Sequence, residues 1–250
     1  MSDFMTAFFT LHHGLPRQAP GSDTTTRRLL ELAGPLPAHP RALDLGCGPG
    51  RSALLLAAEA GAHVTAVDTH QPFLEELAAA ASRRGLADAI DTVNASMARL
   101  PFPDGSFDVI WAEGSAYNIG FDTALRDWKR LLAPGGVLVV TECEWATGTP
   151  SEAARAFWAA EPLRDTTRNT AAAHAAGYTV VAVLAVPDAD WFDEYYTPLA
   201  ARLDVTDTSD PAMAEAVAQS RIEIALRHEH GADYKYTGYV LRPTEDERPR

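Results

Sequence analysis

A short glycine-rich segment, Gly46-Cys47-Gly48-Pro49-Gly50, constrains the fold of this chain more than any other feature. An apolar run at 41–45 precedes it, and a helix-forming run at 51–60 follows it. Glycine lacks a Cβ and adopts positive φ readily, so a strand, a glycine turn and a helix in this order bring backbone close to a ligand. The spacing is G-x-G-x-G and residue 51 is arginine, which departs from the dinucleotide fingerprint G-x-G-x-x-G. The segment therefore predicts a ligand site behind the first strand of an α/β fold.

Segments that favour strands and helices alternate from residue 41 to 143. Continuous apolar strands separated by helices are typical of a parallel sheet that is covered on both faces. After residue 143 the alternation loosens, and a mostly helical stretch at 189–230 precedes the last strand; we expect this insertion at the carboxyl edge of the sheet, where ligands bind. The expected strands are 42–45, 63–67, 89–93, 107–111, 136–143, 178–186 and 234–241, and the other expected helices are 52–60, 72–84, 123–132, 151–160 and 170–176.

Composition excludes several kinds of partner. The chain of 250 residues has a formal net charge of −13, and its acidic and basic residues are interspersed. Such a surface repels phosphate backbones, so nucleic acid is not an expected partner. The sequence has no run of eighteen apolar residues, so no membrane span is expected.

The two cysteines, Cys47 and Cys143, form no C-x-x-C pair and suggest no metal site. As buried free thiols they fit a cytoplasmic location.

The segment Leu43-Asp44-Leu45-Gly46-Cys47-Gly48-Pro49-Gly50 resembles motif I of the class I S-adenosylmethionine-dependent methyltransferases. The resemblance covers residues 40–143 well and the later strands more loosely. It implies S-adenosylmethionine as cofactor, S-adenosylhomocysteine as its product, and a doubly wound, mostly parallel seven-stranded sheet of the Rossmann-like kind. The chain is expected to form a single domain over 1–243, made of an N-terminal helical lid at 1–35, a cofactor-binding core at 40–143 and a helical insertion at 187–232. The tail at 244–250 is charged and contains a proline, so we expect it to be disordered.

The family places its cofactor across the ends of the first two strands. Asp44 matches the acidic residue of motif I, which faces the methionyl ammonium, and a carboxylate there makes a charge-assisted contact. Asp68 lies about twenty residues past the glycines, where a carboxylate accepts from the ribose hydroxyls; the alternative is an ordinary helix-capping aspartate. Thr69 and Met97 would lie against adenine, and Ser96 stands where the family often has an aspartate; a core methionine is the alternative for Met97. The expected cofactor-binding residues are Asp44, Gly46, Cys47, Gly48, Gly50, Asp68, Thr69, Ser96, Met97 and Glu113.

The stretch from Glu113 to Phe121 resembles a set of bacterial small-molecule methyltransferases that share Glu-Gly-x-x-Tyr-Asn-Ile-Gly-Phe. The same set carries a Glu-Cys-x-Trp sequence, matched here by residues 142–145. In methyl transfer the protein positions the nucleophile, and a carboxylate or histidine can take the proton that an oxygen or nitrogen loses. The expected catalytic residues are Glu113, Tyr117, Asn118, Glu142 and His12.

Aromatic residues of the insertion could stack on a planar substrate or surround a cation; packing on the domain or a dimer contact is the alternative. The expected substrate-binding residues are Tyr117, Asn118, Trp145, Tyr195 and Tyr196. For His12 the alternative to a proton acceptor is a solvated side chain, and a surface position is also expected for Arg17.

The sequence therefore predicts a cytoplasmic enzyme, monomeric or homodimeric, that transfers a methyl group from S-adenosylmethionine to an oxygen or nitrogen atom of a small-molecule metabolite. The glycine spacing disfavours a nicotinamide-dependent dehydrogenase. Two alternatives stay open. One is a regulatory protein that binds the cofactor without turnover, and the other is a methyltransferase acting on protein or RNA, which the acidic charge disfavours.

Overall fold

The computed structural model describes residues 2–244, which divide into two compact units. The unit that we call the sheet unit joins Asp23–Glu142, Thr166–Ala185 and the chain from Tyr236 onward. The helical unit joins the chain up to Ser22, Cys143–Asp165 and Val186–Lys235. The single-domain organisation inferred from the sequence stays a prediction, and the expected tail lies outside the described residues from position 245 onward.

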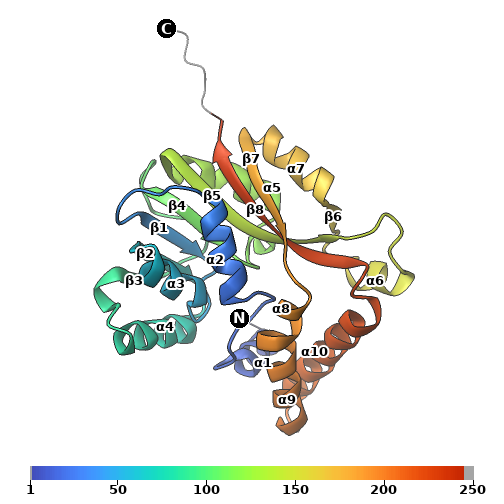
Figure 1. Cartoon of the computed structure of the whole chain (residues 1–250). Helices are drawn as coiled ribbons and strands as arrows, with labels where there is room; N and C mark the ends of the chain where they lie inside the picture. Colours follow the sequence, from blue (N-terminus) through green and yellow to red (C-terminus); the bar gives the residue numbers. More distant parts are fainter. Residues whose placement is uncertain (1, 245–250) are drawn as a thin grey trace. The chain divides into compact units, whose positions relative to one another are not determined.

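Within residues 2–244 the strands form one eight-stranded sheet in the order β3-β2-β1-β4-β5-β8-β7, with β6 paired to β5 off this path (Figure 1). Strands β1 to β5 pair in parallel, and β7 pairs antiparallel with β8. This confirms the Rossmann-like α/β class. The strands are β1 Arg41–Leu45, β2 His63–Asp68, β3 Ile90–Asn94, β4 Phe107–Ala112, β5 Leu132–Trp145, β6 Arg164–Asp165, β7 Tyr178–Ala185 and β8 Tyr234–Pro243.

The expected number of seven strands is wrong, because a two-residue strand, β6, adds to the sheet. Strand β5 spans 14 residues, and its last two, Glu144 and Trp145, pair with Arg164 and Asp165. A pair of charged residues has neither an apolar run nor an alternation that sequence patterns could detect. The extra strand forms because the end of β5 has backbone groups that need partners.

The expected helices are present with shifted ends. The segment expected to be helical at 123–132 ends as a 3-10 turn, η3 (Lys129–Leu131), because β5 already begins at Leu132. The helices are α1 Asp3–His12, α2 Asp23–Leu32, α3 Arg51–Glu59, α4 Gln71–Arg83, α5 Phe121–Trp128, α6 Glu152–Phe157, α7 Thr166–Ala175, α8 Ala189–Trp191, α9 Thr197–Val205 and α10 Pro211–His230, with the π-helix η4 Phe192–Tyr196 and the 3-10 turns η1 Ala87–Ala89 and η2 Ala116–Asn118.

The sheet unit is built in three layers, with an apolar core on each face of the sheet. Successive strand residues point to opposite faces. Ala42 and Trp111 therefore join the core under α2, α3 and α4, whereas Leu43 and Ile110 join the core under α5 and α7 (Figure 1). Strand β1 lies between β2 and β4 in this sheet and its residues 42–45 are buried, so the one polar side chain among them, Asp44, leaves water when the chain folds.

The helical unit packs α1 against α9 and α10 around buried aromatic side chains. The guanidinium of Arg227 lies 3.9 Å from the ring centre of Trp191 and forms an ion pair with Asp188. Arg227 is only 4% exposed, so the aromatic ring and the carboxylate replace the water that this charge loses. Every helix within residues 2–244 is too short or too polar to cross a bilayer.

Gly50 should tolerate alanine worse than Gly85 does. Both glycines have positive φ, +84° and +71°, but a Cβ on Gly50 would lie 2.1 Å from Leu77, whereas a Cβ on Gly85 meets nothing within 4 Å. Backbone strain alone should cost G85A about 1–2 kcal/mol, and overpacking should bring G50A to about 2–4 kcal/mol. Urea unfolding of both variants measures the difference, and equal losses would show that the steric contact is unimportant.

Candidate cofactor site

The glycine turn follows β1 and opens α3. Gly46, Gly48 and Gly50 have φ values of 68°, 52° and 84°, the left-handed region that glycine occupies without strain. A Cβ on Gly46 would lie 2.5 Å from the Cβ of Ser115 and 3.0 Å from the Cε of Met97. The sequence suggests only that these glycines admit a ligand; the structure adds that Gly46 and Gly50 are also required by packing inside the protein.

Asp44 is a buried carboxylate at the end of β1. It is 2% exposed and accepts a hydrogen bond from the backbone of Ala53, in the first turn of α3. Its Oδ2 atom has no hydrogen-bond partner among residues 2–244. Burial raises the pKa of Asp44 well above its ordinary value, and the nearby charges of Glu113 and Asp68 raise it further. The free protein therefore holds an acidic group whose charge lacks a cation.

Asp68 ties the glycine turn to the start of α4. Its Oδ2 accepts from the N–H of Gly48 at 2.9 Å, and its Oδ1 accepts from the N–H of His70 at 2.8 Å. His70 is the N-cap of α4, so Asp68 holds the residue that precedes the helix and does not itself cap the first helical turn. Each carboxylate oxygen keeps a second lone pair. Asp68 can therefore support the turn and still accept hydroxyl groups, while the neighbouring Thr69 is exposed.

Glu113 is fixed by two buried donors. Its Oε1 accepts from the Thr26 hydroxyl on α2 and from the indole N–H of Trp111 on β4, each at 2.8 Å. Thr26 and Trp111 are both fully buried. Sequence reasoning missed Thr26. The available signal was a pair of polar residues, Thr25 and Thr26, on the buried side of a helix that is otherwise amphipathic.

Ser96 and Met97 form a tight turn after β3. The Ser96 hydroxyl accepts from the N–H of Ala98 at 3.3 Å, and the N–H of Arg99 donates to the Ser96 carbonyl at 3.0 Å. The backbone N–H of Met97 has no hydrogen-bond partner within the described residues. A donor of this kind, next to the Met97 side chain, suits the ring nitrogen of a purine.

The remaining candidates of the sheet unit lie after β4 and at the end of β5. Tyr117 and Asn118 are exposed on η2, where the Asn118 amide donates to the Ser115 carbonyl at 2.9 Å. Glu142 is half-buried. The sheet unit thus contains all ten expected cofactor-binding residues and four of the five catalytic candidates, Glu113 included. Cys47 is buried, as expected, and burial raises the pKa of its thiol.

The helical unit contains His12, Trp145, Tyr195 and Tyr196. A solvated position for His12 is wrong: this residue is 1% exposed, its ring stacks on Phe8 at 4.1 Å between ring centres, and its Nδ1–H donates to the Phe8 carbonyl at 2.8 Å. A surface position for Arg17 is also wrong, because this side chain is 6% exposed and its Nε lies 3.4 Å from Glu194. Tyr195 and Tyr196 are buried and stacked at 4.7 Å, and Trp145 is half-buried.

Comparison with known proteins agrees with this geometry. Residues 43–140 match the methyltransferase domain family. The chain is 35% identical over 135 residues to 27-O-demethylrifamycin SV methyltransferase of Amycolatopsis mediterranei (strain S699), covering 52% of this chain and 50% of the relative. The chain spans about half the length of the curated relatives that it matches.

Two solved structures share the fold. A methyltransferase from Geobacter sulfurreducens in complex with S-adenosylhomocysteine superimposes with a TM-score of 0.82 at 20% identity, over 97% of this chain and 98% of that one. SpnF, described as a 4+2 cyclase, superimposes with a TM-score of 0.78 at 22% identity, over 97% and 93% of the two chains. The family match over residues 43–140 and the shared fold together confirm the resemblance to class I methyltransferases seen in the sequence.

Replacing Asp44 with asparagine should stabilise the free protein and weaken ligand binding. The pKa of Asp44 is raised in the folded state, so its contribution to stability is full at low pH and is lost as the pH rises through that folded pKa. At pH 7, D44N should raise Tm by about 2–4 °C for each kcal/mol that it adds to the free energy of unfolding. It should also weaken S-adenosylhomocysteine binding about tenfold or more.

Asp108 offers the matched control for D44N. Hydrogen bonds from Arg41 lower the pKa of Asp108, so the charged form of this carboxylate stabilises the folded protein. D108N should therefore lower Tm and leave binding unchanged. Thermal unfolding and calorimetric titration of both variants would contradict the account if D44N lost stability, or if it bound the ligand as the wild type does.

Proposed function

We propose that this protein transfers a methyl group from S-adenosylmethionine to an oxygen or nitrogen atom of a small-molecule metabolite. The observation that carries the proposal is the acidic edge of the sheet unit: a fully buried Asp44 with an unpartnered oxygen, in range of the charges of Asp68 and Glu113. A buried carboxylate with two half-buried carboxylates near it favours the binding of a cation. S-adenosylmethionine carries two, an ammonium and a sulfonium.

Each part of the cofactor has a chemically matched group in the sheet unit. Asp44 would hold the methionyl ammonium, because a buried carboxylate gains most from a charged donor. Asp68 would accept from the ribose hydroxyls through its remaining lone pairs, and Met97 would donate its backbone N–H to adenine. When bound, the cofactor supplies an electrophilic methyl group on its sulfonium.

Glu113 would act as a fixed polar contact at the reacting end of the cofactor. Two donors hold its Oε1, so its side chain keeps one orientation without any ligand. A preorganised group of this kind loses little entropy when a ligand arrives. Tyr117, Asn118 and Glu142, which follow strand ends in the same unit, are proposed to contact the acceptor, and Trp145, Tyr195 and Tyr196 stay proposed substrate contacts.

His12 is the proposed proton acceptor for the oxygen or nitrogen nucleophile. The Phe8 carbonyl can only accept, so Nδ1 carries the proton and Nε2 keeps its lone pair. Burial lowers the pKa of His12, which keeps the ring neutral at physiological pH. The hydroxyl of Tyr195 lies 3.5 Å from Nε2. A neutral imidazole with a defined tautomer is suited to general-base catalysis.

The fold alone does not require methyl transfer, since a protein described as a cyclase shares it. Binding and transfer therefore need separate measurements. The protein should bind S-adenosylmethionine and S-adenosylhomocysteine in calorimetry, and should form S-adenosylhomocysteine when small hydroxyl and amino compounds are supplied. Binding without turnover on any acceptor would favour the regulatory alternative, and absence of binding would exclude both functions. A cytoplasmic location and a monomeric or homodimeric state are proposed with this activity.

H12N should lower kcat about a hundredfold or more while leaving cofactor affinity unchanged. In the wild type, kcat should fall as the pH drops through the lowered pKa of His12, below its ordinary value of 6.5, because the protonated ring cannot accept a proton. This limb of the pH profile should vanish in H12N. The exposed neighbour gives the control, H13N, which should keep the wild-type profile. A limb that persists in H12N would exclude His12 as the base.

A further inference from the structure

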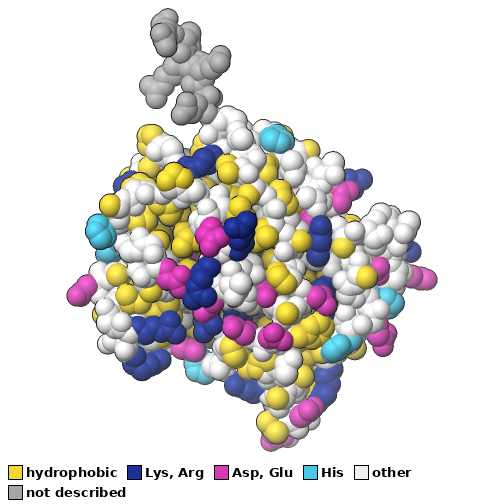
Figure 2. All heavy atoms as spheres, in the orientation of Figure 1, with side chains coloured by type: hydrophobic (Ala, Val, Ile, Leu, Met, Phe, Trp, Pro, Cys, Tyr) yellow, Lys and Arg dark blue, Asp and Glu magenta, His cyan; other side chains and the backbone are white. Residues whose placement is uncertain are grey.

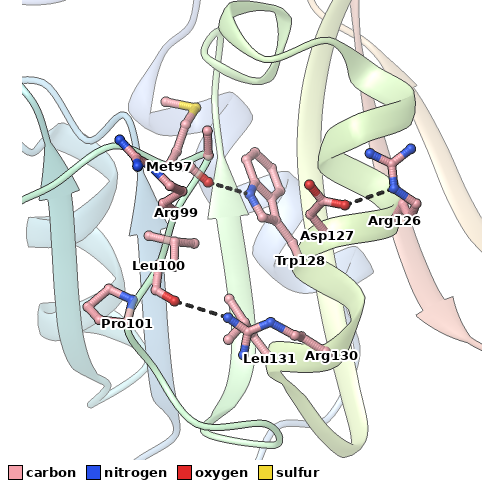
Figure 3. Close-up of a pocket in the computed structure, with 10 residues that line it drawn as sticks. Met97, Arg99, Leu100, Pro101, Arg126, Asp127, Trp128, Arg130 and Leu131 are labelled. Carbon is pink, nitrogen blue, oxygen red and sulfur yellow. Dashed lines mark hydrogen bonds and ion pairs between the residues drawn. The ribbon is translucent and has the colours of Figure 1, made fainter.

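The segment 96–102, which we call the adenine segment, is held by two side chains, one from the last residue of α5 and one from the turn η3 that follows it. The indole N–H of Trp128 donates to the Met97 carbonyl at 3.1 Å. Arg130 donates from Nη2 to the Leu100 carbonyl at 3.0 Å and from Nη1 to the Phe102 carbonyl at 2.8 Å. Figure 3 shows Trp128 and Arg130 reaching the segment from the neighbouring helical turns.

The adenine segment packs on the core through Leu100, Met97 and Phe102, but it also borders a pocket. A cavity of about 610 Å³ lies between residues 97–101 and residues 126–131 (Figure 3). Trp128 is 1% exposed and Leu100 is 8% exposed, so the two elements meet at a few buried points with open space beside them. A loop with a cavity on one side depends on its polar anchors for a fixed position.

The position of Met97 matters for the ligand. Its Cε would lie only 3.0 Å from a Cβ on Gly46, so its side chain borders the glycine turn. Its backbone N–H is without a hydrogen bond within residues 2–244, whereas its carbonyl is engaged by Trp128. The carbonyl and the N–H of one residue belong to adjoining peptide planes. An anchor on the carbonyl therefore limits where the N–H can point.

Resting on the proposed function, we infer that Trp128 and Arg130 are positioning residues that set the cofactor's base selectivity by fixing the backbone N–H of Met97. The N1 atom of adenine is an acceptor and pairs with this donor. The N1 atom of hypoxanthine carries a hydrogen, so two donors would face each other and no hydrogen bond could form. A rigid segment rejects hypoxanthine, and a loosened segment can move away and admit it.

The test compares S-adenosylhomocysteine with S-inosylhomocysteine by calorimetric titration. W128F keeps an aromatic ring in the core and removes one donor, so it should bind S-adenosylhomocysteine about five- to tenfold more weakly. Its preference for adenine over hypoxanthine should fall by a similar factor. R130K, which keeps the charge and loses the two-pronged geometry, should shift both values in the same direction.

R126Q gives the matched control, because Arg126 lines the same cavity but pairs with Asp127. This variant should match the wild type in both affinities. If W128F only destabilised the fold, less protein would bind, but the ratio of the two ligand affinities would stay at its wild-type value. That result would overturn the inference. If the wild-type protein binds S-adenosylhomocysteine but W128F has an unaltered affinity ratio, this inference fails and the proposed function still stands. Wild-type protein that binds neither ligand defeats the proposed function and the inference together.

Discussion

The burial of one carboxylate, Asp44, is the constraint on which the rest of the site depends. Strand β1 lies between β2 and β4, Asp44 pairs in register with Ala66 and Trp111, and its side chain is almost fully buried. The opening turn of α3 supplies one backbone donor. Glu113 and Asp68 add negative charge instead of removing it. The free protein therefore keeps an electrostatic cost of ionising Asp44, which either a proton or a cationic ligand offsets.

The surrounding structure keeps this site rigid. Gly46 and Gly50 allow the turn to pack against Ser115, Met97 and Leu77, and Asp68 joins the turn to α4. Thr26 and Trp111 hold Glu113 in place. Because these contacts exist without a ligand, little rearrangement is needed on binding. The binding free energy therefore comes mainly from the recognition of charge and shape.

Much of the fold could be predicted from the sequence because its signals are local. The apolar pattern around Leu43 and Leu45, followed by three glycines, defines β1, the turn and α3 within a short stretch. Strand β6 could not be predicted, since Arg164 and Asp165 pair only because β5 is long. The Thr26–Glu113 bond and the burial of His12 could not be predicted either, because they depend on contacts between residues far apart in the chain or on helix packing.

The most direct test of the account is the number of protons released when S-adenosylhomocysteine binds, measured by calorimetry in buffers of different ionisation enthalpy. Burial raises the pKa of Asp44 well above its ordinary value in the free protein, and the ligand's ammonium should lower that pKa and force the carboxyl group to ionise. The account predicts proton release that grows as the pH is lowered from neutrality. Binding heat that is the same in every buffer would contradict it.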